Sequence, residues 1–298
     1  LASELSRVGE SWELSGMPGS ESVVAEGPWT GSTLPELIGR FGAELLGKAN
    51  YARFGQEFPL LVKFIDARED LSIQVHPDDE LARKRHGKSG KCEMWYVLEA
   101  EPGASLLTGF SRPIAPAVYE RRVADNTLTD VLNRQAIASG DVFYLPAGRV
   151  HSIGKGSFIV EIQQSSDITY RIYDFDRRDA AGNSRELHTE LAREAIDFES
   201  SENSRITYAP ENNQEVRLVT TPYFTTSLYT LTARTRCDWS ATDSFVAIVL
   251  LQGSGSLTDN EGNRIDVRQG ETWLLPASTQ WTEITPHTAP LRLLTSRI

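Results

Sequence analysis

The sequence predicts a mainly β protein made of two related barrels and a few short helices. Short apolar or β-branched runs recur along the 298 residues, and Gly, Pro, Asn and Asp separate many of them. Two segments, 140–151 and 270–281, also share one pattern: glycine, acidic residue, aromatic residue, Leu-Pro-Ala and a final ring fall at matching offsets. Two copies of one strand–turn–strand unit imply two related barrels, unless a generic β-turn is repeated by chance.

The individual elements follow from local patterns. Residues 32–46 predict a helix, because Ser and Thr precede an early Pro35, an apolar stripe follows and Gly47 ends it. Residues 78–86 and 187–196 predict two shorter helices, the second with Leu187, Leu191 and Ala195 on one face. The predicted strands cover 23–24, 60–65, 71–75, 94–98, 142–145, 158–162, 245–251 and 272–275.

Composition excludes several classes of protein. A net charge of −11 argues against nucleic acid as a partner, although a few local cations can still hold a small anionic substrate. No run approaches the roughly 18 apolar residues of a membrane span, and residues 1–7 are too polar for a signal peptide. The two cysteines, Cys92 and Cys237, form no close-spaced pair, so we expect a reducing, cytoplasmic setting.

Four polar residues near predicted strand ends make a candidate metal site. Gln74 and His76 are two apart on a strand and therefore share a face. Glu93 opens the next strong strand, and His151 follows a tight Pro-Ala-Gly turn. This mixed N/O set suits Zn²⁺ and leaves Mn²⁺, Fe²⁺ and Co²⁺ open. The alternative is that His76, which stands beside a proline, is an ordinary surface or core histidine, as we expect for the three histidines at 86, 188 and 287.

The repeat distinguishes the two barrels. Its last position is His151 in the first copy and Trp281 in the second. Imidazole can bind a metal, whereas the indole nitrogen is only a hydrogen-bond donor. We therefore expect a catalytic, metal-binding domain with helical insertions over 1–200 and a degenerate domain without the ligands over 201–298, joined through the polar stretch 200–214.

Several motifs resemble a known family. The spacing of Gly140, Pro146, Gly148 and His151 matches the second cupin motif, so the two barrels resemble cupin (jelly-roll) barrels. The first cupin motif departs from the usual His-x-His with a nearby Glu. That departure, in the blocks Leu-Ser-Ile-Gln-Val-His-Pro-Asp, Gly-Lys-Cys-Glu-Met-Trp-Tyr-Val-Leu and Leu-Pro-Ala-Gly-Arg-Val-His-Ser-Ile, resembles the type I mannose-6-phosphate isomerases (phosphomannose isomerases) of short bacterial type.

The resemblance extends to further blocks and has one departure. Residues 166–177 resemble the family's segment with its active-site arginine, and 9–13, 59–67 and 196–198 also fit. Members usually begin with a segment containing Trp-Gly-Gly, which the printed sequence does not include. An alternative function, a non-catalytic cupin that binds a sugar phosphate, depends on this departure. A cupin oxygenase fits less well, because the closer His-x-His arrangement is absent.

The resemblance implies a set of site residues. It makes Gln74, His76, Glu93 and His151 the ligands of one zinc ion per chain, and Arg171 the active-site residue. It implies an isomerase that interconverts mannose 6-phosphate and fructose 6-phosphate, with a sugar phosphate as its small-molecule partner. The protein itself is expected to be a monomer or weak homodimer.

The implied reaction moves a proton between C2 and C1 through an enediol(ate). Zn²⁺ can stabilise the enediolate as a Lewis acid, or chiefly position the sugar. Lys91 faces the Glu93 side of its strand, and Glu161 lies on the strand after His151, so either can be the base; solvated positions are the alternatives. Arg171 stays protonated and suits anion stabilisation.

Phosphate and hydroxyl contacts come from weaker candidates. These are Lys63, Ser72 and Arg149. The basic stretch 83–91 links His76 to Glu93, and it is either a phosphate-attracting lid or a solvated helix end.

Overall fold

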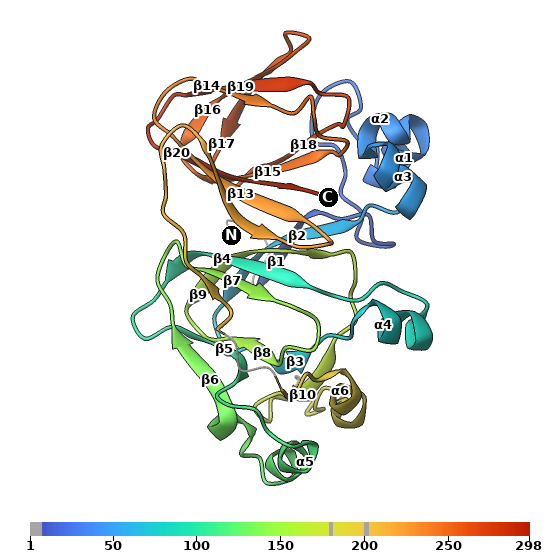
Figure 1. Ribbon diagram of the computed structural model, residues 1–298, viewed down its shortest axis with the longest axis vertical. Coiled ribbons are helices and arrows are strands. Elements are labelled where there is room, and N and C mark those ends of the chain that lie inside the picture. Colours follow the sequence, from blue (N-terminus) through green and yellow to red (C-terminus); the bar gives the residue numbers. More distant parts are fainter. Residues whose placement is uncertain (1–7, 179–180, 200–202) are drawn as a thin grey trace. The chain divides into compact units, whose positions relative to one another are not determined.

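The computed structural model describes residues 8–178, 181–199 and 203–298, and its contacts divide the chain into two compact units. The first unit combines the described residues up to Trp12 with Leu61–Ile206. The second combines Glu13–Leu60 with Thr207–Ile298. Residues 13–60 (blue in Figure 1) are therefore grouped with the C-terminal residues (orange and red), whereas the sequence-based division placed them in the first domain.

The first unit is built around two sheets. A six-stranded sheet has the order β1-β2-β9-β4-β7-β11, and a five-stranded sheet the order β10-β3-β8-β5-β6. The strands are β1 (Glu10–Leu14), β2 (Leu60–Ala67), β3 (Ile73–Val75), β4 (Glu93–Ala100), β5 (Ser105–Phe110), β6 (Leu132–Ala136), β7 (Val142–Leu145), β8 (His151–Ile153), β9 (Ser157–Gln164), β10 (Tyr170–Tyr173) and β11 (Arg205–Ile206).

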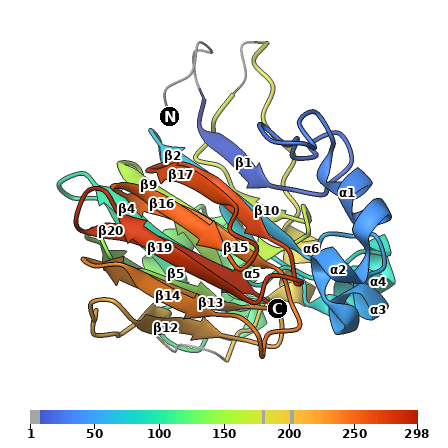
Figure 2. The ribbon, with the colours of Figure 1, turned by 90° about the horizontal axis from the view of Figure 1, so that it is seen from above.

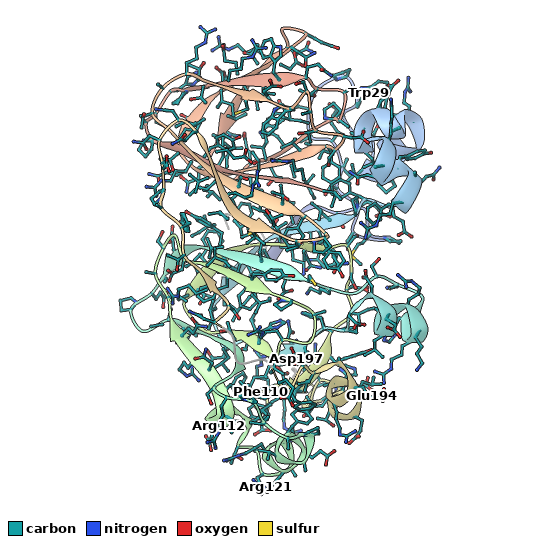
Figure 3. The ribbon with its side chains drawn as sticks, viewed as in Figure 1. Trp29, Phe110, Arg112, Arg121, Glu194 and Asp197 are labelled. Carbon is teal, nitrogen blue, oxygen red and sulfur yellow. The ribbon has the colours of Figure 1, made fainter. Side chains whose placement is uncertain are left out.

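Two apolar clusters cover the two faces of the five-stranded sheet. Inside the barrel, Leu106 and Ile153 pack with Trp95 and Phe143 of the facing sheet. On the outer face, a second cluster joins Ile73 and Val75 to buried residues of three helices: α4 (Asp79–His86), α5 (Pro116–Ala124) and α6 (Thr189–Ala195). Figure 3 labels Arg121 on α5 and Glu194 on α6. Because strand side chains alternate between faces, β3 presents Val75 outward and Gln74 inward.

The second unit has two sheets and three helices. The sheet orders are β12-β13-β20-β15-β18 and β14-β19-β16-β17, and buried residues such as Trp239, Ile248 and Ile284 form its core. Figure 2 shows the helices beside these strands. The elements are α1 (Leu34–Phe41), α2 (Ala43–Leu46), α3 (Lys48–Phe54), β12 (Glu215–Thr220), β13 (Thr225–Leu231), β14 (Thr235–Asp238), β15 (Val246–Gln252), β16 (Ser254–Asp259), β17 (Arg264–Arg268), β18 (Thr272–Leu275), β19 (Trp281–Pro286) and β20 (Leu291–Arg297).

The mainly β prediction is confirmed, and most of the predicted strands are present. Two local predictions are wrong. Residues 23–24 form only an isolated bridge from Val23 to Thr33. The helix over 32–46 is interrupted at Gly42, whose φ of +49° lies outside the helical range. Helix α6 confirms the helix predicted within 187–196; its buried residue is Ala192, whereas Leu191, and Leu187 just before the helix, are exposed.

Further features were not predicted. Helices α3 and α5 were missed, and the expected linker contains the short strand β11, which pairs with β7. No helix in the described ranges is long and apolar enough to cross a lipid bilayer.

Candidate metal centre and active site

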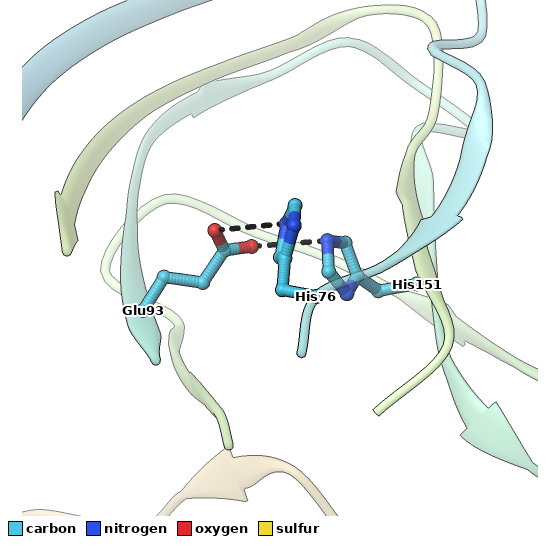
Figure 4. Close-up of side chains that lie close together, drawn as sticks. All are labelled: His76, Glu93 and His151. Atoms are coloured by element: carbon cyan, nitrogen blue, oxygen red, sulfur yellow. Dashed lines mark ion pairs between the residues drawn. The ribbon is translucent and has the colours of Figure 1, made fainter. Parts of the chain in front are cut away.

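Two imidazoles and one carboxylate meet inside the first barrel (Figure 4). His76 directly follows β3, Glu93 opens β4 and His151 opens β8. Glu93 Oε1 lies 3.1 Å from His151 Nε2, and Glu93 Oε2 lies 3.5 Å from His76 Nε2. All three side chains are buried, and their potential ligand atoms lie within 4.8 Å of one another.

Main-chain carbonyls fix which imidazole nitrogens face the carboxylate. His76 Nδ1 lies 2.8 Å from the Ile168 carbonyl oxygen, and His151 Nδ1 lies 2.8 Å from that of Arg149. A carbonyl oxygen only accepts, so each Nδ1 carries a proton, and in the neutral tautomer the lone pair is then at Nε2. Burial and the nearby Lys91 hold the pKa of His76 well below its ordinary 6.5, despite the opposing effect of Glu93. His76 is therefore neutral near pH 7.

These atoms fit a metal ion. His76 Nε2 and Glu93 Oε1 are buried and have no hydrogen-bond partner among the described residues, and Glu93 Oε2 is contacted only by the ammonium of Lys91 at 3.1 Å and the imidazole of His76 at 3.5 Å. Lone pairs that face a carboxylate at this distance repel each other unless a cation lies between them. Burial raises the pKa of Glu93, but the ammonium of Lys91 outweighs that effect and holds the pKa well below its ordinary value, so the carboxylate stays ionised. The donor set suits a divalent cation with N/O preference.

Gln74 lies beside this group but does not yet present a ligand oxygen. Its Nε2 is 3.3 Å from His151 Nε2, and its Oε1 lies 3.4 Å from the Ser72 hydroxyl oxygen. A metal ligand would use Oε1, which requires the amide to turn by half a rotation. The structure therefore brings Gln74 to the site, and its role as a ligand stays a prediction.

Lys91 also reaches the site. Its Nζ lies 3.1 Å from Glu93 Oε2, and its side chain is buried. Burial lowers the pKa of Lys91, but Glu93 and Glu161 outweigh it, so the pKa is raised overall. In the absence of a bound cation, the protein's own charges therefore favour the ammonium form of Lys91.

A second ionic cluster lies in the same barrel. Lys63 Nζ is 3.4 Å from Glu161 Oε1, and the indole N–H of Trp95 donates to Glu161 Oε2 at 2.8 Å. The ring of Trp95 also packs edge-on against His151, with centroids 5.3 Å apart. Trp95 therefore connects Glu161 to the metal group. Lys63 and Glu161 are both buried, so the exposed alternative for Glu161 is excluded.

Arg171 approaches from β10, where it pairs with Gln74 of β3 and therefore shares its face of the sheet. Its guanidinium Nη1 donates to the Glu186 carbonyl at 3.1 Å, and its backbone N–H donates to His188 Nδ1. Its Nε is buried without a hydrogen-bond partner in the described residues. Burial, followed by the nearby Arg185, lowers the pKa of Arg171, yet a guanidinium remains charged.

Arg149, the remaining candidate on this turn, contributes its backbone to the site. Arg149 is buried, its carbonyl orients His151, and its side chain lies so close to Gly109 that a Cβ there would be 2.9 Å from Arg149 Cδ. The turn before His151 is tied to the first histidine, because the Gly148 N–H donates to the His76 carbonyl at 2.9 Å.

The basic stretch after His76 is partly used in structural contacts. Arg85 pairs with Glu194 at 2.5 Å, and Lys88 pairs with Asp167 at 2.8 Å. His86 Nε2 lies 2.8 Å from the Tyr170 hydroxyl. These contacts favour an ordered helix end over a mobile lid.

Sequence reasoning missed three side chains around these clusters. Trp95 is one; it alternates with Glu93 on β4, and that spacing could have placed it inside the barrel. Glu10 and Trp12 are the others: Lys63 Nζ lies 3.8 Å from Glu10 Oε2 and 4.8 Å from the Trp12 ring centroid. Only the pairing of β1 with β2 brings them there, which no local pattern indicates.

Several known proteins are similar to this chain in sequence and in fold. A family model described as phosphomannose isomerase type I, catalytic domain, matches residues 3–107. A mannose-6-phosphate isomerase of Streptococcus mutans is 34% identical over 269 residues, which cover 90% of this chain and 82% of that protein. Another from Bacillus subtilis is 35% identical over 277 residues, covering 91% and 84%. The crystal structure of the mannose 6-phosphate isomerase from Bacillus subtilis superposes with a TM-score of 0.86 at 30% identity, covering 97% of this chain and 90% of the other. From the alignment over both units and the shared fold it follows that the chain belongs to the type I mannose-6-phosphate isomerase family.

Proposed function

We propose that this protein is a zinc-dependent isomerase that interconverts mannose 6-phosphate and fructose 6-phosphate. The observation that carries the proposal is the buried group of His76, Glu93 and His151, whose possible ligand atoms converge within 4.8 Å of one another, in a chain of this family. These three residues, with the amide oxygen of Gln74 once turned inward, would hold the ion. When bound, Zn²⁺ supplies Lewis-acid stabilisation of the negative charge that develops on the sugar oxygens.

The buried charges suggest separate roles in proton transfer. An aldose–ketose isomerisation needs a base that takes the proton from one carbon and returns it to the next. Glu161 is the carboxylate for this role, because Trp95 and Lys63 hold its two oxygens in place. Lys91, whose Nζ lies 3.1 Å from Glu93 Oε2, is placed to stabilise the enediolate as an ammonium.

The phosphate requires a cation that does not titrate. Arg171 has this property, and its buried Nε has a free hydrogen for an anionic oxygen within the described part of the chain. Lys63, Ser72 and Arg149 remain proposals for contacts to sugar hydroxyls or phosphate.

A coupled assay tests the proposal. Purified protein is supplied with mannose 6-phosphate, and fructose 6-phosphate is measured before chelation, after chelation and after zinc is restored. We expect activity to disappear with the chelator and to return with zinc. No turnover by zinc-loaded protein would overturn the isomerase proposal, and full turnover after exhaustive chelation would overturn its zinc dependence.

We further propose that the enzyme acts in the cytoplasm as a monomer or weak homodimer. Both cysteines, Cys92 and Cys237, are buried free thiols, which supports a reducing compartment. Sedimentation of the purified protein would measure its oligomeric state.

A further inference from the structure

Gln163 has a side-chain amide that is fixed in one orientation. Its Nε2 donates to the Gln164 carbonyl at 2.8 Å and to the Ser166 carbonyl at 2.8 Å. Carbonyl oxygens cannot donate, so this end of the amide must be the NH₂ group. The opposite end is therefore an oxygen, and it is buried without a hydrogen-bond partner among the described residues.

The pairing of β4 with β9 places the side chain of Gln163 next to that of Glu93. Glu93 of β4 faces Gln163 of β9 across the antiparallel ladder. The neighbouring pair is hydrogen-bonded, since the Gln164 N–H donates to the Cys92 carbonyl at 3.1 Å. Glu93 and Gln163 are then a non-hydrogen-bonded pair, in which side chains on the same face come closest.

This neighbourhood contains acceptors and few donors. Glu93 presents two carboxylate oxygens here, and the two imidazoles turn Nδ1 to main-chain carbonyls and Nε2 towards Glu93. A buried acceptor without a donor costs free energy, and a second one beside a carboxylate adds repulsion. Lys91 is the ammonium at this site, and it contacts Glu93 Oε2. The oxygen of Gln163 has no partner among the described residues, which indicates that a hydrogen-bond donor enters the site when water, metal or substrate binds.

We propose that Gln163 is a positioning residue of the metal centre, whose Oε1 accepts a hydrogen bond from an O–H group held beside Glu93. In the free enzyme that group is water, and in the complex it is a hydroxyl of the sugar. The second half of this statement rests on the proposed function, whereas the first half concerns metal binding alone. Residues of this kind typically change metal affinity or activity by about 10–100-fold when replaced.

The matched control is the next residue on the strand. Gln164 is also a buried glutamine, but its Oε1 accepts from the Cys92 N–H at 2.9 Å and its Nε2 lies 3.1 Å from Asp79 Oδ1. Gln163→Met and Gln164→Met remove the same groups from opposite faces of β9. We would measure zinc affinity by competition with a chromophoric chelator, the melting temperature of the zinc-free protein, and kcat and KM for mannose 6-phosphate.

We expect both zinc-free variants to have a lower melting temperature than the zinc-free wild-type protein, because both lose structural hydrogen bonds. Only Gln163→Met should lose about tenfold in zinc affinity and show a higher KM. Gln163→Glu keeps an oxygen but replaces the NH₂ donor. Its melting temperature without zinc should therefore fall, while its zinc affinity should stay at the wild-type level. The proposal is overturned if Gln163→Met matches Gln164→Met in zinc affinity and kinetics, or if Gln163→Glu loses zinc affinity as Gln163→Met does.

Two further outcomes identify other causes. A double-mutant cycle with Lys91→Met tests whether the ammonium is the donor, and a coupling as large as the full effect of Gln163→Met would overturn the O–H assignment. If the wild-type protein binds zinc without isomerising mannose 6-phosphate, the proposed function fails. The difference in zinc affinity between Gln163→Met and Gln164→Met then still decides the role of Gln163.

Discussion

The two barrels repeat one strand–turn–strand unit and use its last residue differently. In the first barrel, β7 leads through the turn to His151, which is buried and faces Glu93. In the second, β18 leads to Trp281, which is partly exposed and carries the guanidinium of Arg236 at 4.1 Å from its ring centroid. The same backbone unit thus supplies an imidazole of the candidate metal centre in one barrel and a surface cation–π contact in the other.

The buried polar residues show the same contrast. In the second unit, those of the described chain are Ser, Thr and Asn, whose groups can be satisfied by local hydrogen bonds. A buried charge is costly unless it is paired or functional, so this concentration of buried charges in one barrel is the pattern expected of a functional site. Every buried Lys, Arg, Asp or Glu among the described residues lies in the first unit: Lys63, Lys91, Glu93, Arg149, Glu161 and Asp174.

Exchanging the ring at the end of the repeat should have the largest effect. His151→Ala removes one of three strong donors, so we expect zinc affinity to fall by at least about 100-fold and turnover to be lost. Trp281→His adds an imidazole opposite Asp238 of β14, which is too few donors for a site, so metal content should stay as in wild type. Metal analysis after dialysis measures both. Zinc retained by His151→Ala would contradict the assigned ligand set.

Replacing an arginine in the first barrel should lower catalytic activity, whereas replacing one in the second should not, and neither change should alter the metal content. Arg171→Lys should lower kcat by about 10²–10³-fold, because an ammonium does not reproduce the fixed fork of donors that faces an anion. Arg236→Lys, beside Trp281, should leave kcat unchanged. Steady-state kinetics with parallel zinc analysis provides the comparison; loss of zinc from Arg171→Lys would show a role in metal binding instead.

Each barrel also contains a buried tryptophan whose indole N–H donates to another side chain. Trp95 donates to Glu161 at 2.8 Å, and Trp239 donates to the Thr282 hydroxyl at 2.9 Å. A hydrogen bond to a charged group contributes about 1.5–3 kcal/mol, so Trp95→Phe should reduce turnover by roughly tenfold or more. Trp239→Phe should cost only about 1 kcal/mol of unfolding free energy. Equal turnover in both variants would argue against Glu161 as the oriented base.

The smallest expected effect concerns a helix cap and its pH dependence. In the second unit, Asp243 accepts from the backbone N–H groups of Lys48 (2.8 Å) and Ala49 (3.0 Å) at the start of α3. The N–H groups of Ala49 and Lys48 lower the pKa of Asp243 below its ordinary 3.8. The stabilisation by the ionised cap is therefore fully present above the ordinary pKa of 3.8, and it is lost as pH falls through the lower folded-state pKa.

Asp243→Ala should reduce the unfolding free energy by about 1 kcal/mol at neutral pH, and the difference should shrink in strong acid. Asp78→Ala is the counterpart in the first unit, where Asp78 caps its own helix α4 through the Leu81 N–H at 2.8 Å. Urea unfolding over a pH series compares the two. If the unfolding free energy of Asp243→Ala stays below that of the wild type by the same amount in strong acid, the ionised cap is not the cause of the difference.

The sequence by itself determined the features that depend on local periodicity. Alternation along a strand placed Gln74 with His76 and Lys91 with Glu93, because successive side chains on a strand point to opposite faces. The repeat ending at His151 or Trp281 also needed no structure, since imidazole and indole differ in their chemistry.

Tertiary structure alone decided which strands meet. The pairing of β9 with β4 brings Glu161 to Trp95 and Gln163 to Glu93, and that of β1 with β2 brings Glu10 to Lys63. It also decided the tautomers of His76 and His151, through carbonyls whose positions depend on the folded loops. Local patterns set the face that a side chain occupies. Its neighbours on that face come from distant segments, and their selection depends on the packing of the whole barrel.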